Sequence, residues 1–191
     1  MAAGPKILSR ETLHEGYLTV LRLGVRLADG SEAVRESATR GDAVAVLPYD
    51  ETRRCALVAR LFRAPVLDAA GETALEEACA GMIEAGDGAE ETARREAEEE
   101  LGVFLGPLEP VARTWSSPGV SAERVSLYLA PYAAVDRTGP GGGLETEHEL
   151  VTALERPLAD LAAESEVGAI ADSKLLMLVQ ALRLRRPELF D

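Results

Sequence analysis

The feature that most constrains this chain is a strongly acidic segment, residues 88–101, that has the pattern of one helix. Asp87 stands where a helix N-cap is expected, and Glu90 three residues later completes a capping-box-like pattern. Acidic residues crowd the first turn, where the helix dipole favours negative charge. Gly102 follows as the type of residue at which helices commonly end. The pattern therefore predicts a helix over residues 88–101.

One face of this helix is expected to be small and apolar. At about 100° per residue, Ala89, Ala93 and Ala97 fall on one narrow stripe. Their small side chains would let the helix approach a sheet or a neighbouring loop closely. Three carboxylates share the side of the helix beside this stripe, namely Glu96, Glu99 and Glu100.

These three carboxylates oppose one another, which destabilises an isolated helix slightly. Arg94 and Arg95 relieve only part of the repulsion, whereas a hard divalent cation such as Mg²⁺ would relieve more through carboxylate oxygens. A solvated acidic face explains the same charges, and Asp87 has a sufficient structural role as an N-cap. On charge alone the solvated face is favoured, and the metal site remains the alternative.

The spacing of the residues changes this balance. Residues 81–103 closely resemble the Nudix box, and six of its fixed positions match by identity: Gly81, Arg95, Glu96, Glu99, Glu100 and Gly102. An accidental match of this quality is on the order of one in 10⁵ from ordinary residue usage. Two positions depart from the usual pattern, because Asp87 replaces a Glu and Ala97 replaces a larger aliphatic residue.

The similarity extends beyond the box and is closest to the ADP-ribose and GDP-mannose pyrophosphatase branch of the family. Glu77-Ala78-Cys79-Ala80-Gly81 resembles the lead-in of that branch, and Arg60-Leu61-Phe62-Arg63 resembles its Arg-Gln-aromatic-Arg segment, with Leu61 in place of Gln. Further similar stretches are Ser117-Pro118-Gly119 with Glu123, and the glycine-rich acidic residues 141–147. Cys79 and residues 170–178 favour the GDP-mannose subgroup.

The resemblance implies a role for each matching residue. Glu96 and Glu100 would bind the metal, and Glu99 would bind it or orient a metal-bound water. Arg95 would hold the box glutamates by ion pairing, and the backbone carbonyl of Ala80 would be a further ligand. The implied metal is Mg²⁺, with Mn²⁺ as the alternative. The remaining implied roles are catalytic base or last metal ligand for Glu145 or Glu147, substrate contact for Arg60, Arg63 and Glu77, and support of the box for Gly81, Asp87 and Gly102.

The implied activity is metal-dependent hydrolysis of the diphosphate in a nucleoside diphosphate linked to another group. Divalent ions neutralise the phosphate oxygens and activate water, and a carboxylate removes its proton. A nucleotide sugar such as GDP-mannose is expected, giving GMP and mannose 1-phosphate, with ADP-ribose as the alternative. A nucleotide-binding sensor that keeps the Nudix fold but hydrolyses little is the interpretation from a different class, and Asp87 is the residue that supports it.

The implied fold is mixed α/β (α+β): a Nudix α/β/α sandwich with a mixed β-sheet and the box as loop-helix-loop. Residues 1–191 would form a single Nudix domain, and the β-rich first forty residues are compatible with a homodimer. Apolar runs and turn signals predict further elements. These are strands over 17–27, 33–38, 43–48, 55–61, 111–115, 124–132 and 147–154, an extended piece over 74–80, helices over 157–163 and 170–184, and loops over 67–71 and 139–143.

Composition restricts the partners. The formal net charge of −13, from 33 acidic and 20 basic residues, disfavours a nucleic-acid partner. The sequence contains no apolar run long enough to cross a bilayer and no signal-peptide pattern, so no membrane partner is expected. Cys55 and Cys79 form no recognisable pairing pattern, which favours a reducing cytoplasm. The expected partner is therefore a small nucleotide derivative, together with a second copy of the chain.

Overall fold

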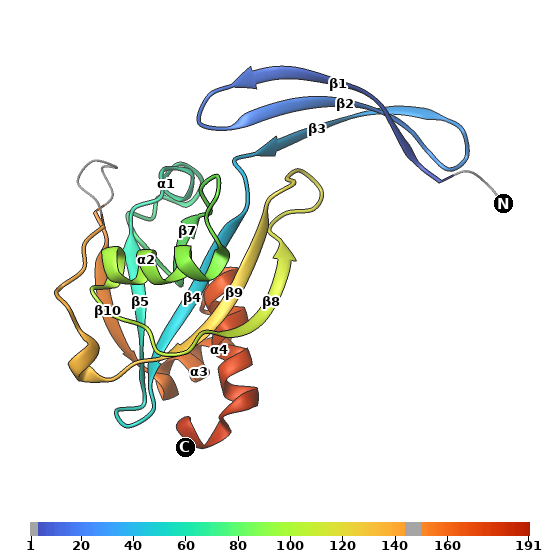
Figure 1. The fold of residues 1–191 in the computed structure, drawn as a ribbon. Helices are drawn as coiled ribbons and strands as arrows, with labels where there is room; N and C mark the ends of the chain where they lie inside the picture. Colours follow the sequence, from blue (N-terminus) through green and yellow to red (C-terminus); the bar gives the residue numbers. More distant parts are fainter. Residues whose placement is uncertain (1–3, 144–149) are drawn as a thin grey trace. The chain divides into compact units, whose positions relative to one another are not determined.

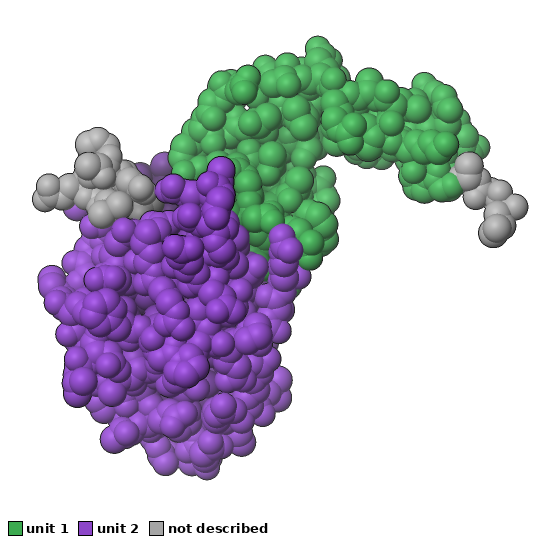
Figure 2. All heavy atoms as spheres, viewed as in Figure 1, with its two compact units in different colours: residues 1–42, 114–125 green, residues 43–113, 126–191 purple. Residues whose placement is uncertain are grey.

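A computed structural model describes residues 4–143 and 150–191 of the chain. The chain divides into two compact units, which are coloured separately in Figure 2. Unit 1 comprises residues 1–42 and 114–125, and unit 2 comprises residues 43–113 and 126–191. The expectation of one Nudix domain over residues 1–191 stays a prediction.

Unit 1 contains a three-stranded antiparallel sheet in the order β1-β2-β3, formed by β1 (Lys6–Glu15), β2 (Thr19–Arg26) and β3 (Glu32–Thr39). The predicted strands over 17–27 and 33–38 are confirmed as β2 and β3, which form a hairpin. Its turn is fixed by Asp29, whose Oδ1 accepts hydrogen bonds from the backbone N–H (2.9 Å) and the hydroxyl (2.6 Å) of Ser31. Strand β1 was not predicted, because its charged and apolar residues do not alternate regularly.

The sheet of unit 1 lacks a core of its own. Every residue of β1 is exposed, and the residues of β2 and β3 are at most half-buried. A sheet of this size needs an apolar face covered by something else to be stable. One backbone hydrogen bond, from the Ala38 N–H to the Val120 oxygen (2.8 Å), joins β3 to the turn at residues 117–121.

Unit 2 is built on a larger sheet with the strand order β10-β5-β4-β9-β8, in which β6 also pairs with β5 and β7 with β4. Its strands among the described residues are β4 (Ala43–Asp50), β5 (Cys55–Leu61), β6 (Leu75–Glu77), β7 (Cys79–Met82), β8 (Glu109–Trp115), β9 (Arg124–Pro131) and β10 (Thr152–Pro157). The outer ends of β8 and β9 belong to unit 1.

Helices cover both faces of this sheet. They are α1 (Ala64–Ala70), α2 (Ala89–Leu101), α3 (Leu158–Glu166) and α4 (Ser173–Arg185), with short 3₁₀ turns η1 (Ala134–Asp136) and η3 (Pro187–Leu189). Helix α2 lies on one face and α3 and α4 lie on the other, as Figure 1 shows. The predicted α/β/α sandwich is therefore confirmed. No helix in the described part of the chain is long and apolar enough to cross a membrane.

The core explains the alanine stripe of the acidic helix. Strand β4 is buried along its whole length, with Val44 and Val46 in the cluster that packs against α2. Ala93 and Ala97 are fully buried in the same cluster, so the small apolar face predicted for the helix is confirmed. Because strand side chains alternate, the intervening residues of β4 point to the opposite face, where α3 and α4 lie.

The start of α2 corrects one prediction. The N-cap is Gly88, without a side-chain cap, and the Asp87 backbone N–H donates to the Glu84 oxygen (3.1 Å) in the preceding turn. The predicted Asp87–Glu90 capping box was therefore wrong. The acidic residues of the first turn still interact favourably with the helix dipole. This interaction explains why the predicted boundaries were accurate to one residue.

The loop predicted over residues 67–71 was also wrong, because α1 occupies most of it. Pro65 lies in the first turn, where its fixed φ suits a helix, and Gly71 ends the helix at φ +74°. Nothing in this short helix is buried, so it has no apolar periodicity that would have indicated it.

The C-terminal elements are shifted relative to their predictions. Helices α3 and α4 correspond to the predicted helices over 157–163 and 170–184. Strand β10 spans Thr152–Pro157, later than the predicted 147–154, and residues 147–149 lie outside the described residues.

The end of α2 is capped by the glycine run that was predicted only as a loop. The backbone N–H groups of Gly142 and Gly143 donate to the oxygens of Glu100 and Glu99, both at 3.1 Å. These are carbonyls that a helix end leaves without intrahelical partners. Gly102 itself has φ +60°, and a Cβ there would lie 2.4 Å from the Gly139 oxygen. The loop therefore approaches the helix end at backbone-to-backbone distance.

This approach predicts an unequal effect of two glycine substitutions. Gly102→Ala should destabilise the fold by about 2 kcal/mol or more, since it combines left-handed strain with a clash against backbone. Gly71→Ala is the matched control, because Gly71 also ends a helix at positive φ but has open space around it, and should cost about 1 kcal/mol. Urea denaturation measures both. Equal losses would show that the loop does not pack against α2 as described.

Candidate active site

Strand β7 and helix α2 bring the residues of the box together. Within β7, Ala80 pairs with Ala45 and Gly81 with Val44 of β4, which fixes the backbone of the lead-in. Glu100 is only 3% exposed, and its Oε2 accepts a hydrogen bond from the Ala80 N–H (3.2 Å). Removing a carboxylate from water is costly, so a buried carboxylate is normally hydrogen-bonded or paired. Glu100 is thus held against the strand that precedes the helix.

Arg95 joins the other two carboxylates. Its Nη2 lies 2.9 Å from Glu96 Oε1, and its Nη1 lies 3.0 Å from Glu99 Oε2. Partial burial lowers the pKa of Arg95, but the charges of Glu96 and Glu99 raise it by more. The pKa is therefore above its usual value, and the guanidinium stays charged. The ion pairs that the resemblance implied for Arg95 are therefore present, while its catalytic role stays a prediction.

Gly81 provides the space in which Glu96 lies. A Cβ built on Gly81 would lie 2.0 Å from Glu96 Oε1 and 2.1 Å from its carboxyl carbon. No side chain can occupy this volume together with the carboxylate. The reason for glycine here is therefore close approach, in contrast to Gly102, where the backbone conformation also requires it.

The chemistry of the donors fits a hard divalent cation. The carboxylates of Glu96, Glu99 and Glu100 and the carbonyl of Ala80 are oxygen donors, which Mg²⁺ and Mn²⁺ prefer. The neighbouring Cys79 is fully buried, and burial followed by the Glu100 charge raises its thiol pKa, so its sulfur stays protonated. Within residues 4–143 and 150–191, no three His, Cys, Asp or Glu side chains converge with ready-made metal geometry. Arg95 instead supplies the counter-charge to two of the carboxylates.

A second cluster contains the predicted substrate residues Arg63 and Glu77. Arg63 Nε lies 2.7 Å from Glu77 Oε1, and Arg63 Nη2 lies 3.2 Å from Glu77 Oε2, so the pair is bidentate. Lys174 Nζ approaches the same Glu77 Oε2 at 3.3 Å and Asp172 Oδ1 at 2.7 Å. Sequence reasoning missed Lys174 and Asp172, although an Asp before Ser and a leucine-rich helix is a recognisable N-cap signal.

The other predicted site residues are exposed or lie outside the described residues. Arg60 is exposed on β5, where it pairs with Glu76 of β6 on one side and Thr152 of β10 on the other. Asp87 is exposed in the turn before α2. Glu145 and Glu147 lie outside the described residues, although Gly143, the last described residue before them, is bound to the end of α2. Their role as base or metal ligand stays a prediction.

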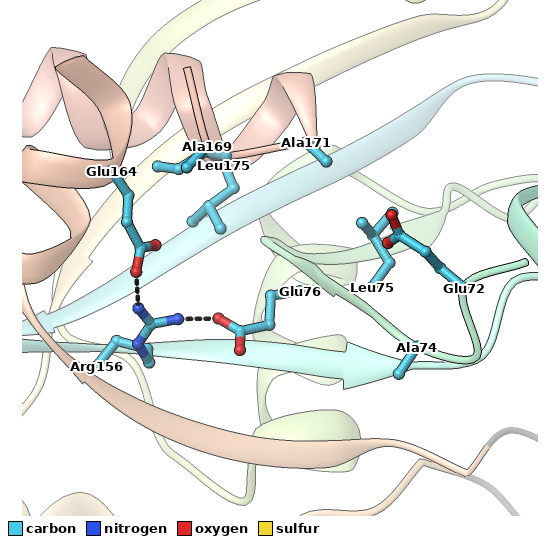
Figure 3. A pocket seen from close by; sticks show the side chains of 10 residues that line it. Glu72, Ala74, Leu75, Glu76, Arg156, Glu164, Ala169, Ala171 and Leu175 are labelled. Carbon is cyan, nitrogen blue, oxygen red and sulfur yellow. Dashed lines mark hydrogen bonds and ion pairs between the residues drawn. The ribbon is translucent and has the colours of Figure 1, made fainter. Parts of the chain in front are cut away.

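A pocket of about 320 Å³ in unit 2 is separate from these residues. Figure 3 shows Arg156 between Glu76 and Glu164, with which it forms ion pairs. The pocket is lined by Glu72, Ala74, Leu75, Glu76, Arg156, Glu164, Ala169, Ile170, Ala171 and Leu175. None of the residues predicted to bind metal or substrate lines it, so the pocket is not part of the candidate active site.

The fold and the box identify the protein family. Residues 39–175 match the family model of the NUDIX domain. The chain therefore belongs to the Nudix family, and the resemblance predicted from residues 81–103 is confirmed. Pyrophosphatases of this family generally depend on a divalent metal.

Similar proteins of known name lie in the predicted branch. A GDP-mannose pyrophosphatase of Cronobacter sakazakii is 32% identical over 97% of this chain and 98% of its own length. An ADP-ribose pyrophosphatase of Escherichia coli is 37% identical over 75% of this chain and 71% of its own length. A crystal structure of an ADP compounds hydrolase matches with a TM-score of 0.78 over 98% of this chain and 97% of that chain. At 19% identity, that structure supports the fold alone.

The Gly81 geometry predicts a defect in metal binding rather than in folding. In Gly81→Ala the new Cβ would displace the Glu96 carboxylate, which is the flexible end of a side chain, so stability without metal should change by less than about 1 kcal/mol. The Mg²⁺ concentration that half-saturates thermal stabilisation should rise about 10- to 100-fold. Gly88→Ala, with open space around the glycine, is the control. Unchanged Mg²⁺ dependence in Gly81→Ala would contradict a metal role for Glu96.

Proposed function

We propose that the chain hydrolyses the diphosphate bond of a nucleoside diphosphate linked to a second group, with GDP-mannose as the first candidate substrate. The observation that carries the proposal is the arrangement of the three box carboxylates. Glu100 is buried and bound to the Ala80 N–H, while Arg95 pairs with both Glu96 and Glu99. A merely solvated acidic face would not bury a carboxylate or require a glycine beside it. The names of the similar proteins support the same reaction.

We propose Mg²⁺ as the metal, with Mn²⁺ as the alternative, held by Glu96, Glu99, Glu100 and the carbonyl of Ala80. When bound, such a cation neutralises phosphate oxygens and lowers the pKa of a coordinated water. The residues of the chain supply the donors and fix their orientation. Arg95 orients Glu96 and Glu99 from the same helix, and the Ala80 N–H orients Glu100 from the strand.

Arg63 is the proposed contact for the substrate phosphates. Its side chain is 37% exposed, whereas that of its partner Glu77 is 6% exposed, so the guanidinium is fixed from the protein side and reachable from solvent. A planar guanidinium suits phosphate oxygens because it donates several hydrogen bonds in one plane. Arg60 is exposed on β5, three residues before Arg63, and is the proposed second contact.

ADP-ribose remains the alternative substrate, supported by the 37% identical relative. The sensor interpretation depended on Asp87 in place of Glu. In the structure Asp87 is an exposed turn residue outside the ion pairs of Glu96, Glu99 and Arg95, so the shorter side chain leaves those contacts intact. This position favours a hydrolase over a sensor.

Product analysis tests the reaction. The purified chain with Mg²⁺ should convert GDP-mannose to GMP and mannose 1-phosphate, and Glu100→Gln should reduce kcat at least about 100-fold because a metal ligand loses its charge. Glu98→Gln removes the same charge from an exposed position of the same helix and should retain activity. Other nucleotide sugars, ADP-ribose and dinucleoside polyphosphates complete the panel. If every substrate stays intact with Mg²⁺ and with Mn²⁺ while a nucleotide binds, the sensor interpretation replaces the hydrolase.

We also propose that the chain forms a homodimer through unit 1. Eight of its large apolar side chains are exposed: Ile7, Leu8, Leu13, Tyr17, Leu18, Val34, Trp115 and Val120. Its ionisable side chains balance, with seven acidic and seven basic residues, so the net charge of −13 belongs to unit 2. Two copies therefore repel least where unit 1 meets unit 1, and a second copy would cover the sheet that lacks a core.

Sedimentation analysis tests the dimer. The wild-type chain should sediment as a dimer, and the double variant Leu13→Asp, Val34→Asp should shift it to monomer by placing charge on the apolar surface of unit 1. Val135→Asp is the control, because Val135 is equally apolar and 88% exposed but lies in unit 2. A monomeric wild type, or a control that also dissociates, would contradict the proposal.

A further inference from the structure

Asp172 ties the start of α4 to the chain between β6 and β7. It is 6% exposed and caps the helix. Its Oδ2 accepts hydrogen bonds from the backbone N–H groups of Leu175 (3.0 Å) and Ala78 (3.1 Å). Its Oδ1 accepts from the backbone N–H of Lys174 (3.3 Å) and from Lys174 Nζ (2.7 Å). The contacts to the Ala78 N–H and to the Lys174 ammonium go beyond those that an N-cap makes.

The ammonium group of Lys174 connects Asp172 to Glu77. Burial lowers the pKa of the Lys174 amine, but Asp172 and Glu77 together raise it above its usual value, so the amine stays charged. The ammonium is thus shared by two carboxylates, at 2.7 Å from Asp172 and 3.3 Å from Glu77. The ammonium lies closer to Asp172 than to Glu77. Asp172 and Glu77 therefore compete for the same ammonium, and Glu77 has a second cationic partner.

That partner is Arg63, whose guanidinium Glu77 binds through both carboxylate oxygens. Arg63 is the N-cap residue of α1, but its side chain makes no capping hydrogen bond. Helix α1 itself buries no residue. The bidentate contact at 2.7 and 3.2 Å to the buried Glu77 fixes the plane of the guanidinium.

We propose that Asp172 is a positioning residue for substrate binding, which acts through Lys174 and Glu77 on the guanidinium of Arg63. This inference rests on the proposed function, in which Arg63 contacts the substrate diphosphate. Without the Asp172 charge, Lys174 moves toward Glu77 and competes with Arg63 for the same carboxylate oxygens. The substrate then meets a less ordered guanidinium, and its affinity falls while the chemistry at the box carboxylates continues.

The test is a double-mutant cycle on the full chain with GDP-mannose and Mg²⁺. Asp172→Asn keeps one side-chain oxygen that can still accept from the Leu175 and Ala78 N–H groups, and it replaces the oxygen that faces Lys174 with an amide that cannot accept. It should raise KM about tenfold with kcat changed less than about twofold, since Asp172 and Arg63 are coupled through one network of ion pairs. In the Arg63→Gln background, Asp172→Asn should have no further effect on KM. Additive effects on KM would overturn the proposal, because they place Asp172 outside the action of Arg63.

Two controls separate this inference from general loss of structure. Asp160→Asn removes the same charge from the first turn of the neighbouring helix α3 and should leave KM unchanged. Thermal unfolding without substrate should show that Asp172→Asn is folded at the assay temperature. If the wild-type chain hydrolyses no substrate, the proposed function fails; if it hydrolyses GDP-mannose but Asp172→Asn leaves KM unchanged, only the positioning role fails.

Discussion

The close approach of helix α2 to strand β7 is the contact on which the candidate site depends. The fully buried Ala93 and Ala97 allow it on the helix side, and Gly81 allows it on the strand side. With larger residues at these positions, the Glu100 carboxylate would no longer reach the Ala80 N–H, nor would Glu96 fit beside Gly81. Ala97, one of the two departures from the usual box, belongs to this close packing. The small residue therefore suits this particular helix–strand distance.

The C-terminal end of the same helix is bound by backbone hydrogen bonds from the glycine run. The N–H groups of Gly142 and Gly143 bind the last carbonyls of α2, and the left-handed Gly102 turns the chain away without a side chain in the path. The carbonyls that are bound belong to Glu99 and Glu100, whose side chains are proposed metal ligands. The glycine run thus has a structural function of its own, independent of the acidic residues that follow it in the sequence.

The sequence predicted what depends on fixed spacing and missed what depends on contacts between distant segments. The box and the alanine stripe follow from a 3.6-residue period. The positions of most strands and helices along the chain follow from apolar runs and turn residues. Strand β1 has no regular alternation and α1 has no buried face, so neither has the pattern that such reasoning detects. The Asp87 cap failed because Gly88 occupies the cap position, which a propensity rule cannot distinguish within one residue. Lys174 meets Glu77, and Asp172 meets the Ala78 N–H, from about a hundred residues away in the sequence, and no local pattern indicates these contacts.

In the proposed function the two clusters offer opposite charges to the substrate, and this division addresses the problem that an acidic chain poses for an anionic ligand. In the box, Arg95 pairs with Glu96 and Glu99, and a divalent cation is the proposed complement to the three carboxylates. The Arg63 cluster instead presents a guanidinium whose own counter-ion, Glu77, is buried beneath it. Burying the acid and exposing the base turns a neutral ion pair into a surface that attracts phosphate. Because unit 2 carries the whole net charge of −13, the bound cation and the exposed guanidinium would both favour binding of a diphosphate against that field.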